Sequence, residues 1–347
     1  MVTSDPVARY LSKHGSKFDR KNRLRTMSSG EILDSSLRIY QRLGLTFLRL
    51  TAAPALLCLA AFGFFDTYVS PRLFTTKSSG NSFLVLQDLG FALALALLVG
   101  GPLVLIGVSY ASSVVVHLVS SYLTGNEPDE AAAVQTARQV LPRLFLVNLK
   151  ELMLSLSGVF VSLVVMAIGG FVAEATPQSD SSAGVISVIG IMGLCAGGLI
   201  FLAIIALDAL AVPIAVLEGA GAKSAGKRSR SLLRRVGYHP SGTSTIWSAY
   251  MLLLFMATVL FGGLALCLSI FSVEDHLSSA LSALPGHALF VAAVDLLPTY
   301  AILWVLIPVW AVAITIVYYE RRIRLEGFDI DELAAEIPKT LATSTRR

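Results

Sequence analysis

The sequence is short of charge. Only 14% of its 347 residues are charged and five are histidine, whereas 55% are hydrophobic. Soluble domains usually carry about 25% charged residues. A soluble domain of this size leaves too much surface facing water to hide so much apolar sequence. The composition therefore indicates an integral membrane protein.

Cysteine is scarce and the common catalytic motifs are absent. Cys58, Cys195 and Cys267 lie in apolar stretches, without CxxC spacing or a neighbouring histidine, so neither a disulfide framework nor a metal site is indicated. There is no HExxH, no Walker-type phosphate loop and no GxSxG. The polar segments are too short to form a catalytic domain. We predict that the protein is not an enzyme and needs no cofactor or metal.

A removable leader is also lacking. The first 42 residues are polar and basic, and no short apolar segment ends at a small-residue cleavage site. The first apolar stretch should therefore remain as a membrane span. We expect residues 1–27 and 334–347 to be flexible cytoplasmic tails and residues 28–333 to form one six-span membrane domain.

Six long apolar stretches are the most informative feature that is present. Each reaches or exceeds the roughly 20 residues needed to cross a hydrocarbon core. We therefore predict an all-α fold with six transmembrane helices. The stretches run through Leu43–Phe65, Phe83–Ser113, Leu144–Val172, Val185–Leu207, Ile246–Ser272 and Ala288–Tyr318.

Basic residues lie on alternate sides of these stretches. Nine precede the first stretch, six fall in Gly219–Thr245 and six follow Tyr318, whereas the opposite loops hold only Arg72 and Lys77. By the positive-inside bias, both termini are cytoplasmic. This predicts a multi-pass protein of the cell inner (plasma) membrane. The external loops should lie near Thr75, Gln178 and Ser279.

An amphipathic segment precedes every second stretch. Ser28 and Glu31 have capping-box spacing at the start of the first segment. Turns at Gly125–Pro128 and Glu218–Gly221 open the other two. The three starts are about 95 residues apart, a longer period than that of solenoid repeats. We expect three repeats, each a surface helix followed by a transmembrane hairpin. Such repeats occur in transporters, and duplication of a stable hairpin leaves the same pattern.

Glycine and proline interrupt two of the stretches. Gly100-Gly101-Pro102 falls inside the second, where proline removes a backbone donor and favours a kink. The helix should then continue past His117 towards Tyr122. Pro298 and Pro308 lie in the sixth stretch and predict a helix that is broken or bent.

The segment before the fifth stretch is a basic amphipathic helix without an acidic residue. Such a helix should lie in the headgroup layer, where each basic residue gains on the order of 1 kcal/mol from anionic lipid. An ordinary positive-inside anchor is the alternative. The candidate headgroup-binding residues are Lys223, Lys227, Arg228, Arg230, Arg234 and Arg235.

Two carboxylates, Asp208 and Asp295, form the candidate intramembrane polar site. A carboxylate near membrane depth is costly and normally faces protein or water. Asp295 lies close to Pro298, so a kinked helix there could bind a proton or a cation. The structural alternative is that each carboxylate hydrogen-bonds to a neighbouring helix.

The last apolar stretch closes with the run Tyr318–Asp329, YYERRIRLEGFD. Its tyrosines suit the membrane interface. Glutamate and arginine recur four residues apart, so Glu320 should pair with Arg324 and Glu326 with Arg322. Gly327 is a natural helix stop. The arginines expected to reach lipid headgroups are Arg321, Arg322 and Arg324.

This closing run resembles the closing signature of the bacterial glycerophosphoryl diester phosphodiesterase membrane domain family, with Glu320 where aspartate is usual. The segments Ser29–Asp34 and Val212–Ser229 are also similar to that family, so the resemblance covers about residues 28–333. It implies a polytopic membrane module. It does not imply phosphodiesterase activity, because the catalytic barrel of the longer family members is absent and the chain has no His-Arg pair.

These features favour a non-enzymatic membrane module that organises lipid, anionic by the charge pattern, or a partner protein at the cytoplasmic face. A small-solute or lipid transporter that uses the repeats and Asp295 is the alternative. An intramembrane lipid-modifying enzyme is the third. Nucleic acid is not an expected partner, because the basic residues lie against membrane crossings.

Overall fold

The computed structural model describes residues 27–69, 91–92, 94–175, 180–233, 242–270 and 287–327. Residues 1–26 and 334–347 of the predicted tails and the three predicted external loops lie outside the described residues. So do Arg234 and Arg235 of the predicted basic helix.

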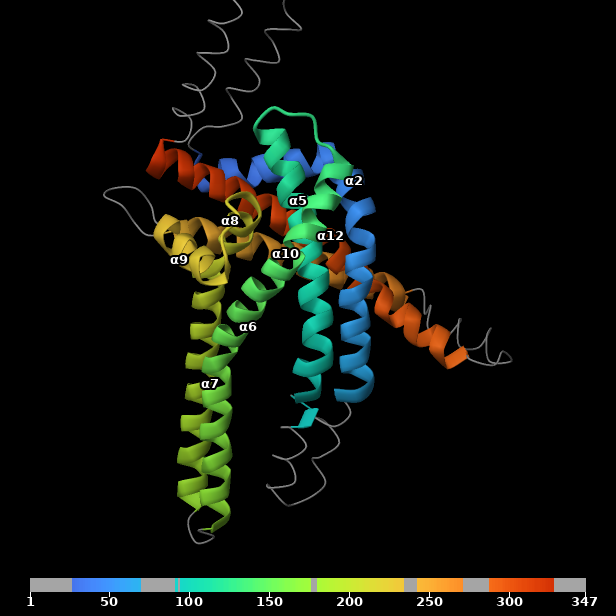
Figure 1. Ribbon diagram of the computed structural model, residues 1–347. Coiled ribbons are helices and arrows are strands. Elements are labelled where there is room, and N and C mark those ends of the chain that lie inside the picture. The colour runs from blue at the N-terminus through green and yellow to red at the C-terminus, as the bar shows by residue number, and fades with distance from the viewer. Residues whose placement is uncertain are drawn as a thin grey trace, which may run out of the picture.

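Within the described ranges the chain is helical apart from short connections (Figure 1). This confirms the all-α prediction for that part of the chain. The α-helices are α2 (Ser29–Phe64), α5 (Gly101–Leu123), α6 (Glu130–Ala175), α7 (Asp180–Asp208), α8 (Ala211–Leu217), α9 (Ala222–Leu233), α10 (Gly242–Ile270) and α12 (His287–Glu326). Two π-helical turns are η1 (Phe65–Val69) and η3 (Ala96–Gly100).

Among the residues that the structure describes, five helical segments are long and apolar enough to cross a membrane. They support a multi-pass membrane protein. The predicted third stretch is not among them; it lies within α6, whose 46 residues make a helix about 70 Å long. The five segments are Ser29–Phe64, Ala96–Leu123, Cys195–Leu217, Thr245–Leu264 and Pro298–Glu326.

The long helices contact their neighbours in the chain, and the first and last of them also pack together. α2 contacts α5, α6 contacts α7, and α10 contacts α12; in addition α12 packs extensively against α2, and α5 packs against α6. Figure 1 shows the α2/α5 and α6/α7 pairs diverging from a common end, which we call the head. The head contains α8, α9, the last turns of α5 and α12, and the first turns of α2 and α6. Here the middle of α5 and residues 308–321 of α12 are almost completely buried.

Local signals set the helix ends in the head. The predicted capping box forms, because the Ser28 hydroxyl accepts from the Glu31 N–H and the Glu31 carboxylate accepts from the Ser28 N–H at 2.8 Å. Gly125, Gly219 and Gly327 adopt left-handed φ values of 77°, 69° and 65°, which glycine reaches without a Cβ clash. The predicted helix stop at Gly327 is thus confirmed.

Neither glycine nor proline breaks the two spans in which they occur. At Gly100 the π-helical turn η3 passes directly into α5, with helical backbone angles at Gly100 and Gly101, and α5 continues to Leu123 as predicted; the kink predicted there stays a prediction. The sixth span is not broken, since α12 runs without interruption through Pro298 and Pro308. The Trp304 side chain of α12 donates a hydrogen bond to the Leu48 carbonyl of α2 at 2.6 Å, which joins these two helices.

Gly107 determines how closely α5 approaches α2. A Cβ atom at this position would lie 2.6 Å from the Pro54 carbonyl oxygen and 2.8 Å from the Cys58 Sγ. Both distances are shorter than real Cβ contacts. The helices therefore meet at this distance only because residue 107 has no side chain, as is common where transmembrane helices pack closely.

We predict that Gly107→Ala lowers the stability of the protein by about 1–3 kcal/mol, the usual cost of overpacking a core. Gly101→Ala is the matched control, because its Cβ would meet nothing closer than 3.9 Å. Unfolding in detergent, followed by circular dichroism, measures both. Equal stability of the two variants would contradict the close approach.

Candidate functional site

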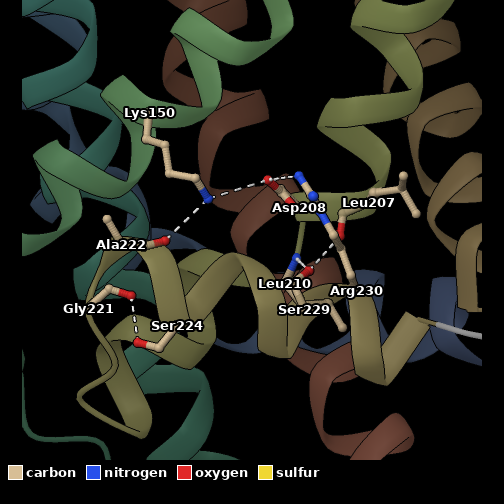
Figure 2. Close-up of polar contacts among 9 residues, drawn as sticks. All are labelled: Lys150, Leu207, Asp208, Leu210, Gly221, Ala222, Ser224, Ser229 and Arg230. Carbon is tan, nitrogen blue, oxygen red and sulfur yellow. Dashed lines mark hydrogen bonds and ion pairs between the residues drawn. The ribbon is translucent and has the colours of Figure 1, made fainter.

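A buried carboxylate lies at the point where α7 ends. The Asp208 side chain is 0% exposed and accepts two hydrogen bonds from Arg230 of α9, at 2.7 Å to Oδ1 and 3.0 Å to Oδ2. The Lys150 ammonium of α6 lies 4.0 Å from Oδ2 (Figure 2). A bidentate guanidinium–carboxylate pair is among the stronger polar contacts in proteins. Asp208, Arg230 and Lys150 therefore connect three helices, and we call them the Asp208 cluster.

Ser229 completes the attachment of α9 to the end of α7. Its hydroxyl donates to the Leu207 carbonyl at 2.7 Å and accepts from the Leu210 N–H at 3.2 Å (Figure 2). Backbone groups at a helix end lack intrahelical partners and need others when buried. Ser229 supplies such partners at the corner between α7 and α8.

The Asp208 cluster matches the structural alternative predicted for this residue. Asp208 hydrogen-bonds to a neighbouring helix, and its charge is compensated by Arg230. The hydrogen bonds to Asp208 raise the pKa of the Arg230 guanidinium, which favours its charged form. Asp295 lies in α12, but its side chain is outside the described residues, and its role stays a prediction.

A second set of contacts, the α12 ring, joins α12 to the α8–α9 connection. Tyr318 donates to Glu218 at 2.9 Å and accepts from Arg322 at 3.2 Å. Arg322 pairs with Glu326 at 3.2 Å, as predicted from their spacing. Arg228 closes the ring, lying 2.5 Å from Glu326 and 3.4 Å from Glu218.

The α12 ring also determines the charge state of Arg228. Burial of the side chain opposes its charge, but the neighbouring Glu218 and Glu326 carboxylates outweigh burial and raise the pKa of the guanidinium. Arg228 thus stays charged and stays paired. The ring ties α9 to the end of α12.

Other residues of the closing run contact the residue before α2 and the end of α5. Arg324 pairs with Glu320 at 2.5 Å, as predicted, and donates to the Met27 carbonyl at 3.2 Å. Tyr319 shares a 2.7 Å hydrogen bond with Ser120 of α5. The closing run therefore holds the first turn of α2 and the end of α5 against α12.

The predicted headgroup-binding residues fall into two groups. Arg321 is only 2% exposed and lies 3.4 Å from Glu320. Lys223 and Lys227 are exposed on α9. The arginines that pair with carboxylates of the chain itself are Arg228, Arg230, Arg321, Arg322 and Arg324. Headgroup binding by any of these residues stays a prediction, and the exposed lysines fit it best.

Two cationic side chains of α6, which the sequence patterns did not single out, reach the α8–α9 connection. The Arg143 Nη1 atom lies 3.3 Å from the position that a Cβ of Gly219 would occupy. Lys150 donates to the Ala222 carbonyl at 3.4 Å. They are seven residues apart and thus on one helix face. The seven-residue spacing is visible in the sequence. It does not show that the two side chains reach the α8–α9 connection, because that segment lies far along the chain.

Comparison of the chain with protein-family models, with curated proteins and with solved structures finds no match. The resemblance of Tyr318–Asp329 to the membrane domain family therefore stays a prediction.

We predict that Arg230→Gln lowers the free energy of unfolding by about 3 kcal/mol. This value is near the lower limit for breaking a buried ion pair, because the Arg230 side chain is 45% exposed. Asp208 would remain buried, with Lys150 at 4.0 Å as its remaining ion-pair partner among the described residues. Adding Asp208→Asn should recover part of the loss, because the two side chains interact directly. Chemical unfolding in detergent measures the cycle.

Lys227→Gln is the matched control for this cycle. It removes one exposed charge from the same helix and should change the stability by no more than about 0.5 kcal/mol. Strict additivity of the Arg230 and Asp208 substitutions would show that the pair does not hold α9.

Proposed function

We propose that the protein is a non-enzymatic integral membrane module that organises anionic lipid, or a partner protein, at the cytoplasmic face. One observation carries this proposal: the charged contacts gather in the head, where they attach α9 to the spans. Lys223 and Lys227 are left exposed there. A basic helix at the end of a span is suited to the anionic surface of the inner leaflet.

The proposed topology has six spans in the inner (plasma) membrane, built as three repeats, with both termini in the cytoplasm. The three contacting pairs, α2/α5, α6/α7 and α10/α12, support the repeats. α6 supplies the third span, since its length exceeds twice the roughly 30 Å hydrocarbon thickness. The basic residues of α9 then lie on the cytoplasmic side.

Two observations favour an organising role over transport. The charge of Asp208 is already compensated by Arg230, which makes that carboxylate a weaker ligand for a coupling ion. A cavity of about 350 Å³ between α2, η3, α5 and α6 has an almost wholly apolar lining that includes Phe62, Leu97 and Leu152. Such a lining suits lipid chains better than a polar solute.

The similarity of Tyr318–Asp329 to the membrane domain family supports the same proposal. Tyr318, Arg322 and Glu326 of that run belong to the α12 ring. We propose that the run serves to attach α9 to the bundle, and thereby to hold the basic helix at the membrane surface.

Native mass spectrometry of gently extracted protein tests the proposed function. We expect anionic phospholipid to stay bound in preference to zwitterionic phospholipid of the same chain length, because α9 presents uncompensated positive charge. A co-purified cytoplasmic or membrane protein would support the partner-protein form of the proposal. Equal retention of the two lipids and no bound protein would contradict it.

Cysteine labelling in intact cells tests the proposed topology. In a variant without Cys58, Cys195 and Cys267, an impermeant reagent should label Gln178→Cys and should not reach Lys227→Cys. Position 227 is chosen because Lys227 is exposed on α9 and belongs to neither the Asp208 cluster nor the α12 ring. Labelling of position 227 with protection of position 178 would reverse the orientation.

A further inference from the structure

The α8–α9 connection lies beside an unusual concentration of positive charge. Arg143 and Lys150 approach it from α6, at Gly219 and Ala222 respectively. Lys223 and Lys227, one turn apart, are exposed in the first half of α9. We call Arg143, Lys150, Lys223 and Lys227 the α6–α9 basic site.

The position of Lys223 on α9 is locally unfavourable. A helix N-terminus carries partial positive charge, so acidic residues stabilise its first turn and basic residues do not. The first turn of α9 holds no acidic residue, and Lys223 is its second residue. A local conflict of this kind is expected where a residue serves binding rather than folding.

Two of the acidic side chains near the site, Glu218 and Asp208, are already engaged. Glu218 interacts with Arg228 and Tyr318, and Asp208 is shared by Arg230 and Lys150. In the part of the chain that the structure describes, no ion pair involves Arg143, Lys223 or Lys227. The site therefore has positive charge to offer to an external anion.

We propose that the α6–α9 basic site binds the phosphate group of an anionic phospholipid in the cytoplasmic leaflet. This inference rests on the proposed function and assigns that function to particular residues. Phosphate suits the site because several cations can share its oxygens. A lipid rather than a soluble phosphate is indicated because α9 contacts both α6 and α7, and the second half of α7 belongs to a segment apolar enough to cross a membrane, beside which acyl chains would lie (Figure 1).

The test compares two variants that lose the same charge. The site variant carries Arg143→Gln, Lys223→Gln and Lys227→Gln; Lys150 is retained because it contacts Asp208. The control variant carries Arg38→Gln, Arg42→Gln and Arg138→Gln, three exposed arginines outside the α6–α9 basic site. Each protein is purified in detergent, checked for folding by thermal unfolding, and titrated with phosphatidylglycerol or with phosphatidylcholine as the matched zwitterionic lipid.

We expect the site variant to bind phosphatidylglycerol at least tenfold more weakly than the unsubstituted protein, and the control variant to bind it within twofold. A charge-preserving variant with Arg143→Lys, Lys223→Arg and Lys227→Arg should bind nearly as well as the unsubstituted protein. This second variant keeps the test valid if neutralisation impairs folding.

Other outcomes would overturn the inference in distinguishable ways. Equal loss in the site and control variants would reject the α6–α9 basic site while leaving the proposed function intact. No preference of the unsubstituted protein for phosphatidylglycerol, together with no bound partner protein, would reject the proposed function itself. Stabilisation by inorganic phosphate as strong as that by phosphatidylglycerol, and lost only in the site variant, would reject lipid as the ligand.

Discussion

The head of the bundle depends on compensating the buried charge of Asp208. An uncompensated carboxylate in a protein interior costs several kcal/mol, and it normally accepts a proton or finds a cation. Here the cation comes from α9, 22 residues further along the chain. The short helix α9, which has few apolar residues of its own, is thereby held against the end of the α6/α7 pair. The α12 ring then attaches the same helix to α12 through Arg228, so that three spans share one polar junction.

The basic residues of the head fall into two groups, those that pair with carboxylates at this junction and those that stay exposed. Arginines that pair with Asp208, Glu218, Glu320 or Glu326 hold the fold together, and the exposed lysines of α9 are the ones for which we propose contact with an anionic surface. Arginine suits the first role because its planar fork binds a carboxylate in two places. Lysine acts as a flexible, strongly hydrated point charge and suits the second.

Local patterns in the sequence predicted the helical parts well. Apolar length predicted five of the six stretches as helices able to span a membrane, the Ser28–Glu31 spacing predicted the capping box, and the four-residue spacing of Glu320 and Arg324 predicted their ion pair. The partners of Arg228 and Arg230 could not be predicted, because Glu218, Asp208 and Glu326 are brought to them by the tertiary fold rather than by helical periodicity. The close packing at Gly107 could not be predicted for the same reason, because it depends on Pro54 and Cys58 of another helix.

The central claim is that polar contacts, and not lipid, hold α9 in place. Hydrogen–deuterium exchange of the amides of residues 222–233, measured in neutral detergent without added phospholipid, tests it most directly. We expect slow exchange in the interior of α9, because Arg230 and Ser229 attach the helix to α7 and Arg228 attaches it to α12. Fast exchange in detergent that becomes slow only when anionic lipid is added would contradict it, and would show that α9 is held by the membrane surface.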